Sequence, residues 1–234
     1  MANSFFKFKQ FIIHQDKCAM KVGTDGVLIG AWTNFSNAQS ILDVGCGTAL
    51  ISIMAAQRNK TAHITGVDID NNAVEQAIIN ASNTEWKERI DIINKDFCLF
   101  DNIYFDVIVS NPPYFVEQVK SPDKSRSIAR SCETLDYKRL IEVSAKILNK
   151  TGRLSFIFPY DYYDEVIEHG LNNKLYAERI AKVYPLPDNK IKRVMIEFSF
   201  EQKETKFEDI IIEKSRHNYS EEYINLTKEF YLKM

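Results

Sequence analysis

The chain has 234 residues, 45% of them hydrophobic, which is enough to bury a substantial core. Its formal net charge of −2 and pI near 6.1 exclude a generally basic nucleic-acid binder, so any such contact must use a local patch. The four cysteines are widely separated without zinc-site spacing, and no apolar run approaches the roughly 18 residues of a membrane span. We therefore expect a cytoplasmic globular protein with free thiols, no metal site and no membrane segment.

The first fifth of the chain predicts a strand and a short helix. Residues 5–13 alternate apolar and polar side chains, as in a half-buried strand; a stacking platform for bases is the alternative. Residues 20–32 predict a short apolar helix that begins after Gly23. Gly26 and Gly30 would each cost this helix about 1 kcal/mol relative to alanine. We expect another backbone or a ligand to approach closely there.

A glycine turn follows the next predicted strand. Residues 40–50 read as strand, turn and helix, and Gly45 and Gly47 allow backbone amides to approach a nucleotide-like ligand. The dinucleotide fingerprint is absent, because Leu50 occupies the position of its last glycine. Asp43 stands just before the turn and would repel a pyrophosphate, so the turn favours a ligand with a positive group.

The following strands also end in polar residues. Asp68 lies at the distance from the glycine turn at which a carboxylate grips ribose hydroxyls in such folds, with helix capping as the alternative role. Asp70 is the better candidate for that cap. A third strand, residues 89–93, leads into Asp96 and Phe97, which could bond and cover an adenine ring, although an Asp-Phe pair is a weak signal.

The most specific short pattern is Asn-Pro-Pro-Tyr at residues 111–114. The apolar run 107–109 predicts a buried strand, and Pro112 and Pro113 end it because neither can donate a backbone hydrogen bond. The chain then presents the amide of Asn111 and the ring of Tyr114 from a stiff loop. An ordinary strand and turn is the alternative, but the pattern resembles the catalytic motif of methyltransferases that modify amino or amide nitrogens.

Strands and helices alternate from residue 41 to 158, which predicts an α/β fold with a mostly parallel sheet and helices on both faces. Ligands bind beyond the carboxyl ends of the strands in such sheets. This edge would gather Asp43, Asp68, Asp96 and Asn111. We find no repeat, linker or second domain.

Two basic segments could contact a phosphate backbone. Residues 117–133 are polar and basic without clear periodicity, as in a lid or a disordered loop, and residues 190–193 form a basic turn. A solvated charged face is an equally good interpretation of both.

Together these motifs resemble those of class I S-adenosylmethionine-dependent methyltransferases. A closer resemblance runs nearly end to end, to the bacterial valine-tRNA adenine-37 N6-methyltransferase family. The segments that carry it are residues 8–11, 20–32, 111–114, 218–223 and 230–232. One departure is Ala49, where the glycine loop of such enzymes commonly has a third glycine.

The resemblance implies a Rossmann-like fold with a seven-stranded sheet in one domain, residues 1–234, whose residues 1–38 close over the cofactor. It implies methyl transfer from S-adenosylmethionine to N6 of adenine 37 in the anticodon loop of valine tRNA. No obligate protein partner is implied. The implied catalytic residues are Asn111, Pro112 and Tyr114, and the implied cofactor-binding residues are Lys21, Thr24, Gly26, Asp43, Gly45, Gly47, Asp68, Asp96, Phe97 and Asn111.

Other activities stay open from the residues alone. Adenine in DNA or ribosomal RNA, or the glutamine amide of a release factor, would suit the same Asn-Pro-Pro-Tyr site. Only about forty residues precede the glycine loop, too few for a separate domain that would hold a protein substrate. Asp43 and the absent third glycine argue against a nucleotide-dependent oxidoreductase. The intact residues 111–114 argue against a catalytically silent RNA-binding module.

Overall fold

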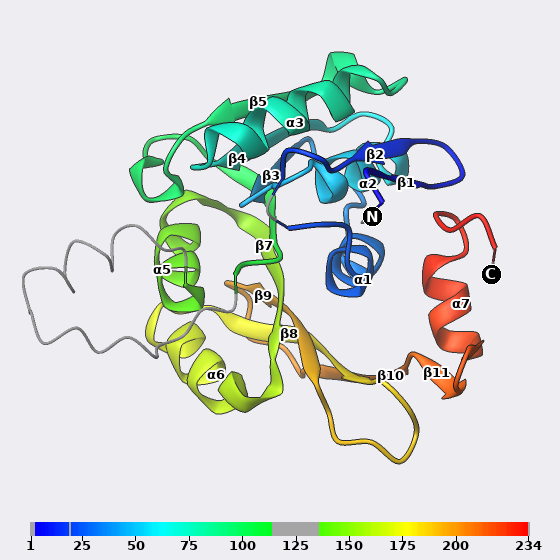
Figure 1. The fold of residues 1–234 in the computed structure, drawn as a ribbon. Helices are drawn as coiled ribbons and strands as arrows, with labels where there is room; N and C mark the ends of the chain where they lie inside the picture. The colour runs from blue at the N-terminus through cyan, green and yellow to red at the C-terminus, as the bar shows by residue number, and fades with distance from the viewer. Residues whose placement is uncertain (1–2, 19, 114–135, 234) are drawn as a thin grey trace, which may run out of the picture.

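The computed structural model describes residues 3–18, 20–113 and 136–233 (Figure 1). Its centre is an eight-stranded sheet in the order β10-β8-β9-β7-β6-β3-β4-β5. The strands are β3 (Ser40–Val44), β4 (His63–Asp68), β5 (Ile90–Asn94), β6 (Phe105–Ser110), β7 (Leu148–Pro159), β8 (Tyr176–Tyr184), β9 (Arg193–Ser199) and β10 (Lys206–Ile211).

The sheet is mostly parallel, as the alternating pattern predicts. Strands β7, β6, β3, β4 and β5 pair in parallel, whereas β9 runs antiparallel to both β7 and β8. The expected count of seven is one short, because β10 adds a parallel edge strand beside β8. Because β10 is an edge strand, it pairs on one side only, and its Phe207 is exposed. Its sequence therefore shows no clear alternation of buried and exposed residues.

Helices cover both faces of the sheet, which confirms the predicted architecture (Figure 1). Neighbouring residues of β3 show the division, since Ile41 packs in one core cluster and Leu42 in the other. The first cluster lies beneath α1, α2 and α7, and the second beneath α5 and α6. The helices are α1 (Thr24–Trp32), α2 (Leu50–Arg58), α3 (Asn71–Ser82), α5 (Tyr137–Ile147), α6 (Tyr163–Asn172) and α7 (Glu221–Thr227), with short 3₁₀ turns at Lys87–Arg89, Phe97–Leu99 and Tyr160–Tyr162.

The N-terminal segment differs from its prediction. The single strand expected over residues 5–13 is a hairpin of β1 (Phe5–Lys7) and β2 (Ile12–His14). The chain turns between them because Phe8 N–H donates to the Phe11 carbonyl at 2.9 Å, and their rings stack with centroids 4.7 Å apart. A second short hairpin, β11 (Glu213–Ser215) with β12 (Asn218–Tyr219), precedes α7.

Both glycines of α1 lie close to neighbouring side chains. A Cβ on Gly30 would be 2.7 Å from the sulfur of Met54, so this glycine lets α1 pack tightly on α2. A Cβ on Gly26 would be 3.2 Å from Leu50 Cδ2 and 3.8 Å from Asn111 Nδ2. The expected close approach is therefore found, but its partners are side chains rather than a backbone. Over the described residues, no helix has the length and apolar character needed to cross a membrane.

Candidate active site

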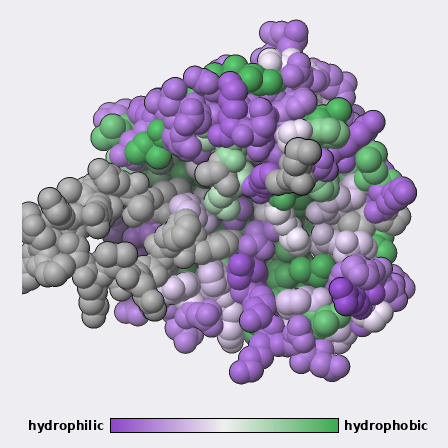
Figure 2. All heavy atoms as spheres, viewed as in Figure 1, coloured by the Kyte–Doolittle hydropathy of each residue, from purple (hydrophilic) through white to green (hydrophobic). Residues whose placement is uncertain are grey.

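A cavity of about 300 Å³ opens at the carboxyl ends of β3, β4 and β6. Its wall is built from residues 20–23, 44–48, 67–70 and 95–98, with Cys18, Gly26, Leu50, Ile51, Ala73, Asn111 and Pro113. In the space-filling view, mostly hydrophilic side chains with some apolar ones among them cover the upper part of the molecule, where α3 and β5 lie, and paler atoms lie beneath them (Figure 2). The cavity is largely apolar with a few charged groups, which suits a nucleoside-sized ligand.

The glycine loop is fixed in shape by the neighbouring strand β4. Gly45, Gly47 and Ala49 all have positive φ, at 68°, 53° and 62°. The amide of Gly45 donates to the Val67 carbonyl at 2.9 Å. Ala49 occupies the position of the third glycine, and its left-handed backbone costs roughly 1 kcal/mol. Its fully buried methyl group, at 0% exposure, offsets part of that cost.

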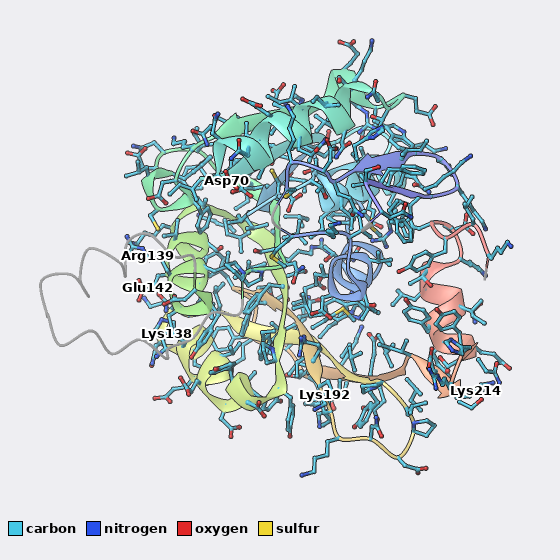
Figure 3. All side chains as sticks on the ribbon, viewed as in Figure 1. Asp70, Lys138, Arg139, Glu142, Lys192 and Lys214 are labelled. Carbon is cyan, nitrogen blue, oxygen red and sulfur yellow. The ribbon has the colours of Figure 1, made fainter. Side chains whose placement is uncertain are left out.

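Asp68 lies in the cavity wall and supports the loop. Its Oδ2 accepts from the Gly47 amide at 2.9 Å, and its Oδ1 accepts from the Asp70 amide at 3.0 Å. The side chain is only half-buried, so its remaining lone pairs are available to a ligand in the cavity. Asp70, labelled in Figure 3, caps α3 by accepting from the Asn72 amide at 2.9 Å, which confirms the predicted cap.

Asp43 is the predicted site residue whose surroundings differ most from expectation. It is fully buried, does not line the cavity, and its Oδ2 accepts from the backbone amide and the hydroxyl of Ser52 at 2.9 and 2.6 Å. Its Oδ1 has no hydrogen-bond partner among the described residues. Burial raises the pKa of Asp43 to about 7, against the lowering effect of the Ser52 hydrogen bonds, and the charge of Asp68 adds to the rise.

This raised pKa predicts a pH-dependent stability. The folded state holds the proton more tightly than the unfolded state, so Asp43 stabilises the fold fully below pH 3.8 and loses that contribution as the pH rises through about 7. Between pH 5 and pH 8 the loss is about 3 kcal/mol. The measurement is urea unfolding of the cofactor-free chain and its Asp43→Asn variant at pH 5 and pH 8. The advantage of the wild type over the variant should shrink by that amount; an unchanged difference would contradict the assignment.

Asp96 and Phe97 lie together on the far wall of the cavity. Asp96 Oδ1 accepts from the Cys98 amide at 2.8 Å, which begins the 3₁₀ turn Phe97–Leu99. Phe97 is 4% exposed, packs in the core and also lines the cavity. The pair can therefore offer a carboxylate oxygen and an aromatic surface to a planar ring.

The residues predicted from the N-terminal block divide into two groups. Lys21 and Gly26 line the cavity, whereas Thr24 is exposed on the first turn of α1 and does not. An ion pair that the sequence does not reveal holds this turn in place, since Arg193 Nε lies 2.8 Å from Asp25 Oδ2. No periodicity links β9 to α1, so the sequence carried no signal for it.

Asn111 follows β6 and faces the cavity beside Gly26 and Leu50. Pro112 instead lines a small neighbouring cleft with Pro113, Tyr137, Phe158, Pro159 and Tyr162. Tyr114 and the basic segment 117–133 lie outside the described residues. The structure thus brings together Lys21, Gly26, Gly45, Gly47, Asp68, Asp96, Phe97 and Asn111 around one cavity. The cavity also includes Cys18, Lys95 and Cys98, which no pattern in the sequence singled out.

Comparison with known proteins assigns this arrangement to a family. Residues 23–178 match the methyltransferase small domain family. The tRNA1(Val) (adenine(37)-N6)-methyltransferases of Phocaeicola vulgatus and Bacteroides thetaiotaomicron are 46% and 45% identical to the chain, over 100% and 99% of both sequences. The chain belongs to this methyltransferase family. The resemblance inferred from residues 8–11, 20–32, 111–114, 218–223 and 230–232 is thereby confirmed.

Solved structures of other methyltransferases share the fold of this family member. A predicted O-methyltransferase from Agrobacterium tumefaciens superposes with a TM-score of 0.70 at 17% identity, over 88% of this chain and 96% of the other. A ribosomal protein L11 methylase from Lactobacillus delbrueckii subsp. bulgaricus gives 0.59 at 14% identity, over 81% and 84%. At these identities the likeness establishes the class I methyltransferase fold alone.

Membership in the family makes the chain a methyltransferase with S-adenosylmethionine as its methyl donor. The donor set of the cavity fits that cofactor. A carboxylate at the end of β4 suits ribose hydroxyls, positive-φ glycines expose backbone next to the ligand, and Phe97 gives the cavity an aromatic wall. Asp43 does not line the cavity, so it can act on a ligand there only from a distance.

Proposed function

We propose that this enzyme transfers the methyl group of S-adenosylmethionine to N6 of adenine 37 in the anticodon loop of valine tRNA. The observation that carries the proposal is the position of Asn111, which follows a central strand and faces the cofactor cavity. The choice of tRNA rests on the relatives, whose names state that substrate and which match over their full length. Because the substrate is a tRNA, we expect the enzyme to act in the cytoplasm.

The acceptor chemistry follows from the nature of the adenine amino group. Its lone pair is delocalised into the ring, and no side chain at neutral pH can remove its proton first. In the proposed complex, the Asn111 side-chain oxygen and the Pro112 carbonyl accept hydrogen bonds from the two N–H groups of the adenine amino nitrogen. These bonds favour a tetrahedral geometry at that nitrogen. This stabilisation grows towards the transition state, in which the nitrogen–methyl bond forms as the sulfur–methyl bond breaks. S-adenosylhomocysteine leaves, and the methylated nitrogen then loses its proton to solvent. Tyr114 would stack on the flipped-out base, an interaction worth about 1–3 kcal/mol.

The remaining residues bind and orient the donor, which supplies an electrophilic methyl group on a positively charged sulfur. We assign Asp68 to the ribose hydroxyls, Asp96 and Phe97 to the adenine, Gly45 and Gly47 to close backbone approach, and Asp43 to the ammonium group. Lys21 and Gly26 would lie beside the methionine portion, because both line the cavity. Thr24, which does not line it, would act only by beginning α1. Holding donor and acceptor in register supplies much of the rate.

We further propose that the chain forms one methyltransferase domain in which the segment before α1 covers the cofactor. Supporting this, Cys18 and residues 20–23 line the cavity. Lys190 and Lys192 are exposed in the turn before β9 and make no ion pair within the described part of the chain. Figure 3 labels Lys192. Both lysines are candidates for phosphate contacts of the anticodon arm.

The test is transfer of labelled methyl from S-adenosylmethionine to total bacterial tRNA. We expect label in tRNA and none in ribosomal RNA, DNA or purified release factors incubated in parallel. Protein-bound label without tRNA label would replace adenine with a glutamine amide as the acceptor. Absence of label from every acceptor, with intact cofactor binding, would overturn the proposal.

A further inference from the structure

The segment that covers the cavity has little regular structure of its own. None of the described residues between 15 and 23 belongs to a helix or strand. Its backbone groups therefore lack the ladder partners that fix an ordinary wall of a binding site. Yet Cys18 and residues 20–23 contribute directly to the cavity.

Asn80 of α3 supplies part of the missing support. It is fully buried, at 0% exposure. Its Oδ1 accepts from the His14 amide at 2.9 Å, and its Nδ2 donates to the His14 carbonyl at 2.9 Å. One side chain therefore hydrogen-bonds both the backbone N–H and the carbonyl of the last residue of β2. The same Nδ2 donates to the Thr48 carbonyl at 2.9 Å, and Thr48 lies in the glycine loop and lines the cavity. Asn80 thus joins the end of β2 to the glycine loop without lining the cavity.

Two glutamines continue the same support along the segment. Gln76, 2% exposed and one helical turn before Asn80, accepts from the Lys17 amide at 3.2 Å. Gln15, 5% exposed, accepts from the Val22 amide at 2.9 Å and donates to the Asn3 carbonyl at 3.0 Å. We call Gln15, Gln76 and Asn80 the amide clamp.

Burial makes the clamp depend on the position of the segment. A buried amide without partners is unfavourable, so the clamp is satisfied only while residues 14–18 and 20–22 keep their place beside the cavity. Ala73 lies on the same face of α3 as Gln76 and lines the cavity, so this face of one helix serves both the cavity and the segment above it.

We propose that Asn80 and Gln76 are positioning residues for the methyl donor: they fix residues 14–18 and 20–22 beside the cavity and thereby set cofactor affinity. The proposal rests on the assignment of this cavity to S-adenosylmethionine and not on the choice of tRNA. A purely structural role would lower stability without a matching loss of cofactor affinity.

The decisive variants are Asn80→Asp and Gln76→Met. Asn80→Asp keeps the size and the acceptor but replaces the donor that bonds the carbonyls of His14 and Thr48. Gln76→Met removes one hydrogen bond and keeps the length of the side chain. It tests the proposal if Asn80→Asp does not fold. Asn83→Asp introduces the same charge at the exposed end of α3, and Val166→Ala weakens the core on the other face of the sheet. These two are the controls.

Calorimetry with S-adenosylmethionine should show a dissociation constant raised about tenfold or more in Asn80→Asp, less in Gln76→Met, and within about twofold of wild type in both controls. Hydrogen exchange should quicken at the amides of residues 15–18 and 20–22 in the clamp variants alone. If both clamp variants bind the cofactor as tightly as Val166→Ala, the clamp is only structural and the inference fails. If the wild type itself does not bind, the cofactor assignment fails instead.

Discussion

Replacing Asn111 with alanine is expected to lower kcat for methyl transfer by about a hundred- to a thousandfold, the range seen when one group that stabilises a transition state is removed. The amide faces the cavity beside Gly26 and Leu50. In the proposed complex its oxygen accepts a hydrogen bond from the adenine amino group. Cofactor affinity should change by less than about threefold, since the methyl donor is held mainly by other walls of the cavity. Single-turnover kinetics and calorimetry on the same preparation separate the two effects.

The matched control for this prediction is Asn225→Ala. Asn225 is an exposed asparagine of α7, remote from the cavity, and its only side-chain bond in the described part of the chain is to Lys228. It should leave both kcat and cofactor affinity unchanged. A large loss of cofactor binding in Asn111→Ala, with transfer restored at saturating cofactor, would show that Asn111 belongs to the donor site rather than to the acceptor site.

Asp68→Ala should produce the opposite division, with the dissociation constant of S-adenosylmethionine raised about a hundredfold. The substitution removes the carboxylate that the ribose would use, and it also removes the acceptors of the Gly47 and Asp70 amides. Hydrogen bonds to a charged group are worth about 1.5–3 kcal/mol each, so losing them together has a large effect. Calorimetry measures the affinity, and kcat at saturating cofactor should fall much less.

Asp68→Asn helps to separate ligand binding from support of the loop. Its amide oxygen can still accept from one of the two backbone amides, so the loop should keep more of its shape while the charge is lost. Asp101→Ala, at an exposed aspartate before β6, is the matched control. Unchanged cofactor affinity in Asp68→Ala would remove this residue from the proposed site.

The sheet and its functional edge could be predicted because they depend on local patterns. Short apolar strands alternate with helices along the chain, and parallel strands deliver their carboxyl ends to one edge. The residues placed there by sequence, Asp68, Asp96 and Asn111, do meet around one cavity. Gly45 and Gly47 have the left-handed backbone that their place in a tight turn implies.

The remaining features depend on contacts that leave no local trace. The turn inside residues 5–13 forms because Phe8 packs on Phe11 and pairs with Tyr231 near the end of the chain. Asp43 stands in a strand-end pattern like that of Asp68, but its carboxylate bonds Ser52 inside the core. Neither the turn at Phe8 nor the burial of the Asp43 carboxylate follows from the periodicity of the sequence.

Hydrogen bonds and ion pairs between side chains and distant parts of the chain are the second kind of feature that the sequence could not predict. Asn80 and Gln76 look like ordinary polar positions of an amphipathic helix, yet both are buried and bond the backbone of a segment about sixty residues away. The Asp25–Arg193 ion pair likewise joins α1 to β9 across most of the chain. Such bonds shape the cavity without contributing a recognisable motif.

In the proposed function, the cavity holds the methyl donor and Asn111 positions the exocyclic nitrogen of adenine 37 to receive its methyl group. The most direct measurement is mass spectrometry of nuclease fragments from a valine-tRNA transcript incubated with the enzyme and S-adenosylmethionine. A transcript with guanine at position 37 and the Asn111→Ala enzyme serve as controls. We predict one N6-methyladenosine, at position 37, and none in either control. Methylation at another nucleotide, on a ring nitrogen or ribose, or undiminished with Asn111→Ala, would contradict the account.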